Sequence, residues 1–417
     1  MKSKMKAQFA VLAAVPFVMV LGNSMLIPVF PQLQRAMDLT PFQVGLIITA
    51  FSLPAGLLIP FTGALSDHVG RKTVMAPFLA IYGIGGLIAG FAALLLAKPY
   101  GMVIAGRIVQ GIGAGGTYQL AMALTGDIFT SEERVKTLGL LEASNGLGKV
   151  LSPILGSLVG LIAWFAPFFA YGVAALPVAA LVWFVIKEEV KEENKRSLGE
   201  YWQGLKGIFK KKAVPLLASY MVGMLVLFLL FGVLSFLSDD LEGRFDIRGF
   251  RKGFVIAIPV GAMALVSYLS GFLLQNRRQF LKPVILVGVA LAGISLVGAA
   301  LFTGLVPFMI TMTLLGISIG STLPPINLLI TGAAPTSERG LVTSLYGTVR
   351  FFGVALGPPT FGLASALGRR PMFFGAAALA GIVLVLAWFL IDPQRLLAGQ
   401  KKEGRDDDHP AHEGHWV

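Results

Sequence analysis

Charged side chains occur inside long apolar stretches of this chain, where they must find partners. The stretches hold Arg107, Lys149 and Arg350, and Glu142 lies two helical turns before Lys149. A charge at the centre of a membrane-spanning helix costs about 2.5–3.5 kcal/mol even on lenient scales, so such residues indicate function. A buried cation can hold an anion, and a buried lysine can give up its proton because desolvation disfavours the charged form. The pattern therefore predicts a site for anion binding or proton exchange.

Helical spacing sets further polar residues near these charges. Arg107 begins a stripe with Gly111, Ala114 and Tyr118 that falls within about 40° on a helix, which suits a cavity wall. Two alternatives stay open: Arg107 extends to the membrane surface, or Lys149 forms a structural ion pair with Glu142. The expected cavity is lined by Arg107, Tyr118, Glu142, Asn145, Lys149, Asn327 and Arg350.

A short polar loop, "GALSDHVGRK", separates two apolar runs between Gly63 and Lys72. A carboxylate such as Asp67 at the end of a span favours a helix N-terminus or a cation, since each offers unpaired positive charge. Gly63 and Gly70 permit close backbone approach and a tight turn. The loop is either a specific contact between helices or an ordinary charged turn.

Several kinds of chemistry are excluded by composition. The chain has no cysteine, so neither disulfides nor thiolate chemistry is available. The pattern G-x-G-x-x-G at 111–116 lies inside an apolar run with no preceding strand, and a phosphate-binding loop motif is missing, which argues against nucleotide chemistry. His68 lies in the body, whereas His409, His412 and His415 lie in a polar tail. We therefore expect no enzyme activity, no cofactor and no metal site.

The elements that must position these residues are membrane-spanning helices. Hydrophobic residues make up 55% of the 417 and charged residues only 13%, and the mean hydropathy is +0.78. Each apolar run is roughly the 20 residues that cross a bilayer as a helix. The prediction is an all-α membrane protein of twelve helices in two sets of six. The runs are 8–30, 42–64, 73–96, 101–126, 138–160, 161–186, 213–236, 253–274, 283–303, 306–332, 341–366 and 371–391.

The longest charged stretch between runs divides the chain. It covers residues 187–212 and is basic enough to lie at a membrane surface as an amphipathic helix. We predict a first six-helix bundle over 1–186, a cytoplasmic linker over 187–212 and a second bundle over 213–392. The polar tail 393–417 is expected to be disordered.

The distribution of Lys and Arg predicts the orientation. With the N-terminus placed inside, 23 of the 34 basic residues fall on the inner side and 8 on the outer side. The positive-inside rule then places both termini in the cytoplasm. The net charge of +12 is accordingly a topology signal and does not indicate nucleic acid.

The two halves repeat each other in sequence. A shift of 205 residues sets "GIGAGGT" (111–117) over "GISIGST" (316–322), Gly148 over Gly353 and Pro153 over Pro358. Two parallel six-helix repeats around a site at the membrane midplane are an architecture of secondary transporters. A duplicated, purely structural bundle is the alternative.

Three motifs resemble those of the major facilitator superfamily. "GALSDHVGRK" resembles the family's signature between helices 2 and 3, and "RIVQGIGAG" (107–115) resembles its fourth-helix signature. The fifth run is similar to the antiporter signature of drug-exporting members, with serine in place of glycine at 152 and 157. The residues of that packing motif are Gly139, Gly148, Ser152, Pro153 and Gly156.

The resemblance implies roles for individual residues. In the family, the loop between helices 2 and 3 latches the two halves together on the inner side, and the fourth-helix arginine, here Arg107, is associated with proton transfer. The implied latch consists of Gly63, Asp67, Gly70, Arg71 and Arg134. His68 departs from the family's usual arginine, and the chain lacks the carboxylate that many drug:proton antiporters carry in the first or fourth helix.

These observations predict a secondary active transporter in a bacterial cell membrane. We expect proton-coupled efflux of small amphipathic compounds by alternating access, with the substrate, protons and the lipid bilayer as partners of a monomeric chain. Export or flipping of anionic amphiphiles or lipid-linked substrates is the alternative that the cationic cavity favours. A membrane enzyme lacks a polar catalytic cluster, and single-channel recording would distinguish a channel.

Overall fold

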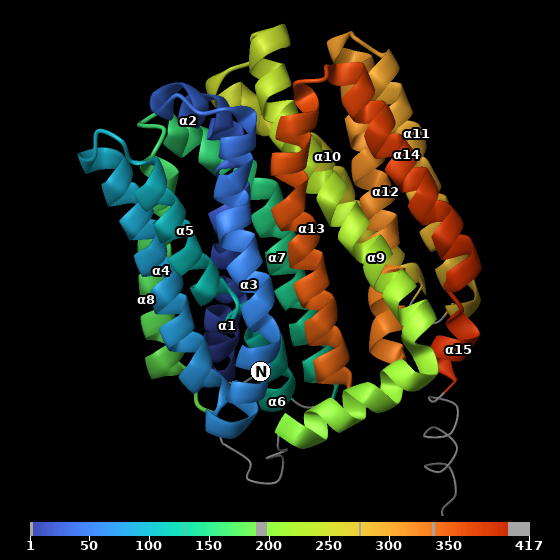
Figure 1. Ribbon diagram of the computed structural model, residues 1–417. Coiled ribbons are helices and arrows are strands. Elements are labelled where there is room, and N and C mark those ends of the chain that lie inside the picture. The colour runs from blue at the N-terminus through green and yellow to red at the C-terminus, as the bar shows by residue number, and fades with distance from the viewer. Residues whose placement is uncertain (1–2, 130, 189–197, 275–276, 336–337, 399–417) are drawn as a thin grey trace, which may run out of the picture.

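The computed structural model describes residues 3–129, 131–188, 198–274, 277–335 and 338–398, and every regular element among them is helical. The helices run roughly side by side in one bundle, with the two halves of the chain next to each other (Figure 1). Helices suit a bilayer because they satisfy their backbone hydrogen bonds internally. The predicted all-α fold class is confirmed.

The described residues of the first half form eight α-helices and one short 3₁₀ helix. They are α1 (Ser3–Ser24), η1 (Ile27–Val29), α2 (Phe30–Met37), α3 (Pro41–Val69), α4 (Arg71–Leu95), α5 (Tyr100–Ala114), α6 (Tyr118–Ile128), α7 (Ser131–Gly160) and α8 (Ala166–Val185). The second half contains α9 (Leu198–Phe245), α10 (Gly249–Leu274), η3 (Arg278–Phe280), α11 (Leu281–Leu301), α12 (Leu305–Gly332), α13 (Arg339–Ser365), α14 (Arg369–Leu390) and α15 (Pro393–Leu397).

Ten helical segments among the described residues are long and apolar enough to cross a membrane. Two more segments complete the twelve: α7, and α5 together with α6. The fourth run was expected to be one helix over 101–126, but its backbone breaks at residues 115–117. The break falls at two consecutive glycines that pack closely on neighbouring helices: a Cβ on Gly115 would lie 2.7 Å from Leu58, and one on Gly116 would lie within 3 Å of Phe78.

Helix α9 is longer than the expected run 213–236. It begins at Leu198 and continues without a break to Phe245. Its first turns lie across one end of the bundle, below α13 in the view of Figure 1, before the helix rises into the second half. Residues 198–212 of the predicted linker are thus helical and continuous with the seventh span.

The two ends of the bundle are called the linker face and the far face. The linker face holds the turn between α3 and α4, the start of α9 and α15, whereas the far face holds α2 and the turn between α9 and α10 (Figure 1). At the linker face, Gly70 separates α3 from α4 with φ of 96°, a left-handed conformation that glycine adopts without strain.

The halves repeat each other in packing as well as in sequence. A Cβ on Gly111 of α5 would collide with the carbonyl of Phe51 on α3, and one on Gly316 of α12 would collide with that of Pro259 on α10. The same relation joins α7 to α1 and α13 to α9. The predicted repeat of 205 residues therefore corresponds to two bundles with equivalent helix contacts.

Contacts between the halves follow the same two-fold relation. Helix α3 of the first half packs on α13 of the second, and α10 of the second packs on α7 of the first. These two seams hold the interface, so any side chain that points between α6, α7 and α13 lies where both halves can reach it.

Candidate functional site

Arg107 is fully buried and bonded within the first half. Its guanidinium donates to the carbonyls of Ile47 (3.1 Å) and Gly22 (2.7 Å) and to Oδ1 of Asn23 (2.7 Å). It also donates to Oε1 of Gln110 at 2.6 Å and packs over the ring of Phe51 at 4.5 Å. These acceptors are neutral and come from α1, α3 and α5, so Arg107 ties three helices together.

This position differs from both interpretations offered by the sequence. Arg107 does not extend to the membrane surface, since none of its side chain is exposed. Of the stripe that follows it, Gly111 packs on α3 and Ala114 is buried, whereas Tyr118 bonds to Glu142 of α7. The five donors of a guanidinium can serve acceptors from several helices at once, which explains why an arginine is held here.

Four other predicted residues come together at the interface of the halves. The phenol of Tyr118 on α6 donates a hydrogen bond to the carboxylate of Glu142 on α7. Lys149, two turns further along α7, interacts electrostatically with Glu142 and with Arg350 of α13. Arg350 also interacts with Tyr118. Tyr118, Glu142, Lys149 and Arg350 are called the central cluster below.

The charges of the central cluster do not balance. It contains two cations, Lys149 and Arg350, and one carboxylate, Glu142, with Tyr118 as a hydrogen-bond donor. Glu142 is exposed although its partners lie inside the bundle, so its surface faces the interior between the halves. Like charges held together in a poorly solvated place favour an incoming anion or the loss of a proton.

Unpaired polar atoms surround the central cluster. Nε of Arg350 and the hydroxyl of Tyr346, over whose ring Arg350 packs at 5.4 Å, are buried without a hydrogen-bond partner among the described residues. Oε1 of Gln119 is also buried without a hydrogen-bond partner among the described residues. Nε2 of the same side chain lies 3.4 Å from the position that a Cβ on Gly347 of α13 would take. Buried polar groups are normally bonded, so these atoms are candidates for contact with water or a ligand.

Gln119 and Tyr346 were missed by sequence reasoning. Both are uncharged and lie in apolar runs, where glutamine and tyrosine attract less notice than a charge. Helical spacing offered a weak signal, because Tyr346 precedes Arg350 by one helical turn. Of the remaining predicted residues, Asn145 is buried on α7 and Asn327 is half-buried on α12.

The space between the halves widens from the far face toward the linker face. Along the α3–α13 seam, a Cβ on Gly45 would collide with Pro359, one on Gly56 would lie 2.8 Å from Phe351, and one on Gly63 would lie 3.6 Å from Ser344. Along the α7–α10 seam, Gly253 is tightly packed against Pro153 and Ser157 near the far face. The structure is therefore closed at the far face.

Glycines nearer the linker face on the same two helices meet open space. A Cβ on Gly139 or Gly146 of α7, or on Gly261 of α10, would have no atom within 4 Å. Gly139, which was predicted in the packing motif, therefore has no neighbour at its Cβ position. Around these glycines the packing is looser than at the tightly packed far face.

The other residues of the predicted packing motif lie where α7 meets its neighbours. Gly148 faces Phe17 of α1 across an ordinary van der Waals distance of 3.4 Å, and Gly156 packs directly on the Met25 carbonyl. Ser152 is fully buried. The carbonyl of Pro153 lies 2.6 Å from the position of a Cβ on Gly253 of α10, so the motif serves both the first half and the interface.

At the linker face, the predicted latch residues form an ion network inside the first half. Nε of Arg71 pairs with Asp127 at 3.0 Å, and its Nη2 lies 3.7 Å from Asp67. The backbone N–H groups of Arg71 and Lys72, at the start of α4, donate to the carboxylate of Glu188 at 2.7 and 2.8 Å. Asp127 and Glu188 were not among the predicted latch residues. Gly63 faces Ser344 of the second half, and the side chain of Arg134 lies outside the described residues.

At the far face, a buried ion network joins the halves. Glu242 of α9 accepts from Lys252 of α10 at 2.7 Å and from Arg35 of α2 at 2.7 Å. Lys252 is 1% exposed and Glu242 is 7% exposed, whereas the Arg35 side chain is 62% exposed. Sequence reasoning had counted Arg35 and Lys252 only as outer-side charges and missed this network. Its signal would have been the three acids Asp239, Asp240 and Glu242, which come shortly after the apolar run 213–236.

Comparison with known proteins agrees with the fold and the repeat. The sequence profile of the Major Facilitator Superfamily matches residues 12–358 and 253–413. A "Bacillibactin exporter" of Bacillus subtilis is 36% identical over 386 residues, covering 92% of this chain and 96% of its own. The "Multidrug resistance protein MdtL" of Escherichia fergusonii is 26% identical, covering 91% of this chain and 94% of its own.

Among solved structures, a D-xylose-proton symporter superposes with a TM-score of 0.76 at 13% identity, covering 94% of this chain and 99% of that one. At this identity the likeness concerns the fold. The predicted family is confirmed, and with it the prediction that the chain is a membrane transporter and not an enzyme. The chain belongs to the major facilitator superfamily.

Proposed function

We propose that this transporter exports small amphipathic compounds across the cell membrane in exchange for protons. The observation that carries the proposal is the central cluster, in which Tyr118, Glu142 and Lys149 of the first half meet Arg350 of the second. Because both halves contribute residues to this site, its geometry changes whenever the halves rock against each other, as alternating access requires. Two relatives that match most of the chain are named as an exporter and a multidrug resistance protein.

The direction of transport follows from the proposed orientation. If the linker face is cytoplasmic, as the distribution of basic residues predicts, the tightly packed far face is the outer one, and substrate would load from the cytoplasm. Opening of the far face would then require the separation of Arg35 from Glu242 and of the two seams near that face. Substrate would leave to the outside.

Lys149 is the proposed proton-exchanging group. It shares the centre of the molecule with a second cation, Arg350, and with one carboxylate. A proton on Lys149 adds a second positive charge beside Arg350 and so repels a cationic amphipathic substrate, whereas a neutral Lys149 removes that repulsion. Loading a proton from outside and releasing it inside would thereby change the affinity for substrate in the two states.

The net positive charge of the central cluster supports a second candidate substrate class. Export or flipping of anionic amphiphiles or lipid-linked substrates would use Arg350 and Lys149 as a two-point anchor for a carboxylate or phosphate. Bacillibactin should be included in the test, because the 36% identical relative is named as its exporter.

Transport in proteoliposomes under an imposed pH gradient tests both candidates. Bacillibactin, cationic dyes and anionic amphiphiles would be offered to the parent protein and to Lys149→Ala. We expect Lys149→Ala to lose pH-driven transport or to bind anionic ligands at least about tenfold more weakly, the loss of one charge-assisted contact. Lys136→Ala is the control, since Lys136 is exposed on the same helix. Parental rates, pH dependence and ligand preference in Lys149→Ala would make the lysine structural.

A further inference from the structure

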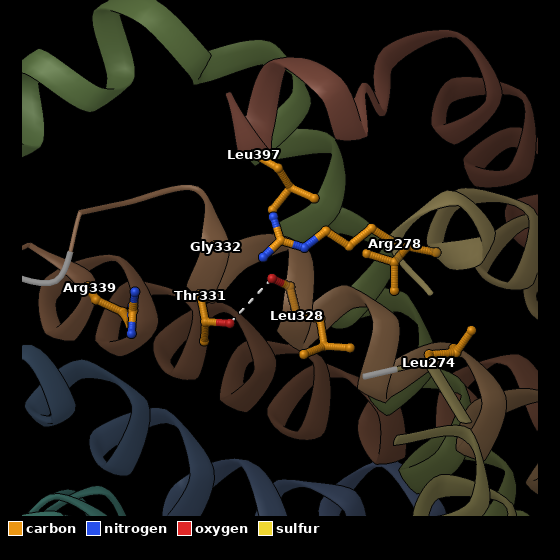
Figure 2. Close-up of a pocket in the computed structure, with 8 residues that line it drawn as sticks. Leu274, Arg278, Leu328, Thr331, Gly332, Arg339 and Leu397 are labelled. Carbon is orange, nitrogen blue, oxygen red and sulfur yellow. Dashed lines mark hydrogen bonds between the residues drawn. The ribbon is translucent and has the colours of Figure 1, made fainter. Parts of the chain in front are cut away.

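A pocket opens at the linker face of the second half, away from the central cluster. It encloses about 170 Å³ and lies between the ends of α10 and α12 and the starts of α11 and α13. Two arginines line it, Arg278 of η3 and Arg339 of α13. Figure 2 shows the guanidinium of Arg278 on one side of Thr331 and Arg339 on the other.

Within the part of the chain that the structure describes, the two arginines of this pocket form no ion pair with an acidic side chain. Among the described residues, no Asp or Glu lines it, and the sequence has none at positions 275–276 or 336–337 beside it. Nε of Arg339 is buried without a hydrogen-bond partner in the described part of the chain. Lys212 adds a third cation nearby, because its ammonium donates to the carbonyls of Ala333 and Leu396, which adjoin the lining residues Gly332 and Leu397.

Guanidinium groups match phosphate and carboxylate oxygens in geometry and charge. Arg278 and Arg339 line the same pocket, and no carboxylate is among its described lining residues. Such a pair of guanidinium groups forms a site for an anion. The hydroxyl of Thr331 already donates to the carbonyl of Asn327 at 2.7 Å, so its oxygen remains available as an acceptor. The polar end of the pocket therefore suits a headgroup that carries a phosphate.

The rest of the lining is apolar. Its apolar side chains are Leu274, Leu281, Leu328 and Leu397. Large apolar side chains next to the pocket are exposed on the outer surface of the bundle, among them Phe272 at 71% and Phe280 at 44%. In a membrane protein such residues face lipid, so a ligand held by the arginines could extend its apolar part directly into the bilayer.

We propose that this pocket binds the phosphate headgroup of an anionic phospholipid in the leaflet at the linker face. The lipid would bridge Arg278 and Arg339 and so join η3 to the start of α13, the helix that forms a seam with the first half. The inference goes beyond the proposed transport function and does not depend on the substrate or on its direction of movement.

Lipid titration of the delipidated protein in detergent tests the proposal without any transport assay. Phosphatidylglycerol, phosphatidylcholine and inorganic phosphate would each be added, and binding would be followed by native mass spectrometry and by the thermal unfolding midpoint. We expect phosphatidylglycerol to bind about tenfold more tightly than phosphatidylcholine. Arg278→Gln should weaken phosphatidylglycerol binding about tenfold, the loss of one charge-assisted contact.

The control is Arg277→Gln, which removes the same charge from an exposed neighbour that does not line the pocket. It should change the affinity less than about twofold, as expected for an exposed charge. Arg278 is itself exposed, so its replacement leaves the fold intact, whereas Arg339→Gln is a second variant that should weaken binding further.

Equal phosphatidylglycerol binding by the parent and Arg278→Gln would overturn the assignment of the pocket. Equal binding of phosphatidylcholine and phosphatidylglycerol would overturn the role of net headgroup charge. Inorganic phosphate that bound as tightly as phosphatidylglycerol, with the same dependence on Arg278, would overturn the lipid and leave a site for a soluble anion.

Discussion

Arg107 and Arg350 are both arginines inside the bundle, but their surroundings differ. Arg107 is bonded on all sides by neutral acceptors of one half. Arg350 lies near Lys149 and Tyr118 of the other half and keeps a buried Nε without a partner among the described residues. A satisfied cation inside one half stabilises a rigid body, whereas an unsatisfied cation between halves is available to a ligand.

The ion networks at the two faces repeat this contrast. At the linker face, the described contacts of Arg71 with Asp67 and Asp127 stay within the first half. At the far face, Arg35 reaches across to Glu242 of the second half. The contact between Arg35 and Glu242 thus joins the two halves at the closed face. Alternating access requires that contacts at this face break when the face opens.

Replacing Arg107 should produce the largest effect, and it should be an effect on folding. Arg107→Gln leaves several buried acceptors without a donor, each costing about 1–3 kcal/mol, so we expect a loss of about 3 kcal/mol. The thermal unfolding midpoint and the yield of the purified protein should both fall. Arg107→Lys should also be destabilised, because a compact ammonium cannot serve acceptors from three helices.

The control for Arg107 is Arg370→Gln, which removes the same group from an exposed position on α14. Its midpoint should stay near that of the parent. An Arg107→Gln protein that unfolded at the parental temperature but failed to transport protons would reverse the comparison and return Arg107 to the transport site.

Arg35→Gln should produce an intermediate effect on conformation. It removes the contact between halves and leaves the buried Glu242–Lys252 pair intact. Because Arg35 is largely exposed, the contact is worth about 0.2–1 kcal/mol, which shifts the far-face-open population at most about fivefold. Spin labels at Lys98→Cys and Leu367→Cys, in a chain without native cysteines, would measure the separation of the halves at the far face.

Asp246→Asn is the matched control, since it breaks an exposed pair with Arg248 at the same face and within the second half. The distance distribution should be unchanged. If Arg35→Gln and Asp246→Asn gave the same distribution as the parent, the crossing contact would have no part in closing the far face.

Asp67→Asn should produce the smallest effect. Arg71 keeps its closer partner Asp127 at 3.0 Å when the carboxylate at 3.7 Å is neutralised. We expect transport to slow by less than about twofold, with a slight shift toward the linker-face-open state. Asp127→Asn, measured in the same proteoliposomes, should slow transport more. The opposite order would mean that Asp67 acts through contacts other than Arg71.

Much of this structure is readable from the sequence because the bilayer imposes one length and one secondary structure on each span. The repeat of 205 residues also carried information, since it brought Lys149 and Arg350 to one interface. The break at residues 115–117 was not predicted, because the apolar run continues through it. The role of Arg107 was not predicted either, since two of its acceptors are the backbone carbonyls of Gly22 and Ile47, which residue types do not specify.

The break between α5 and α6 separates two tasks within one span. Above it, Arg107 fastens α5 to the frame of the first half, and below it, α6 carries Tyr118 and Gln119 toward the second half. Substitutions in α6 can therefore change what is recognised without disturbing the arginine that holds the frame. Selection for new substrates would act on Tyr118 and Gln119, whose replacement leaves the bonds of Arg107 intact, and this gives the span a route to evolve.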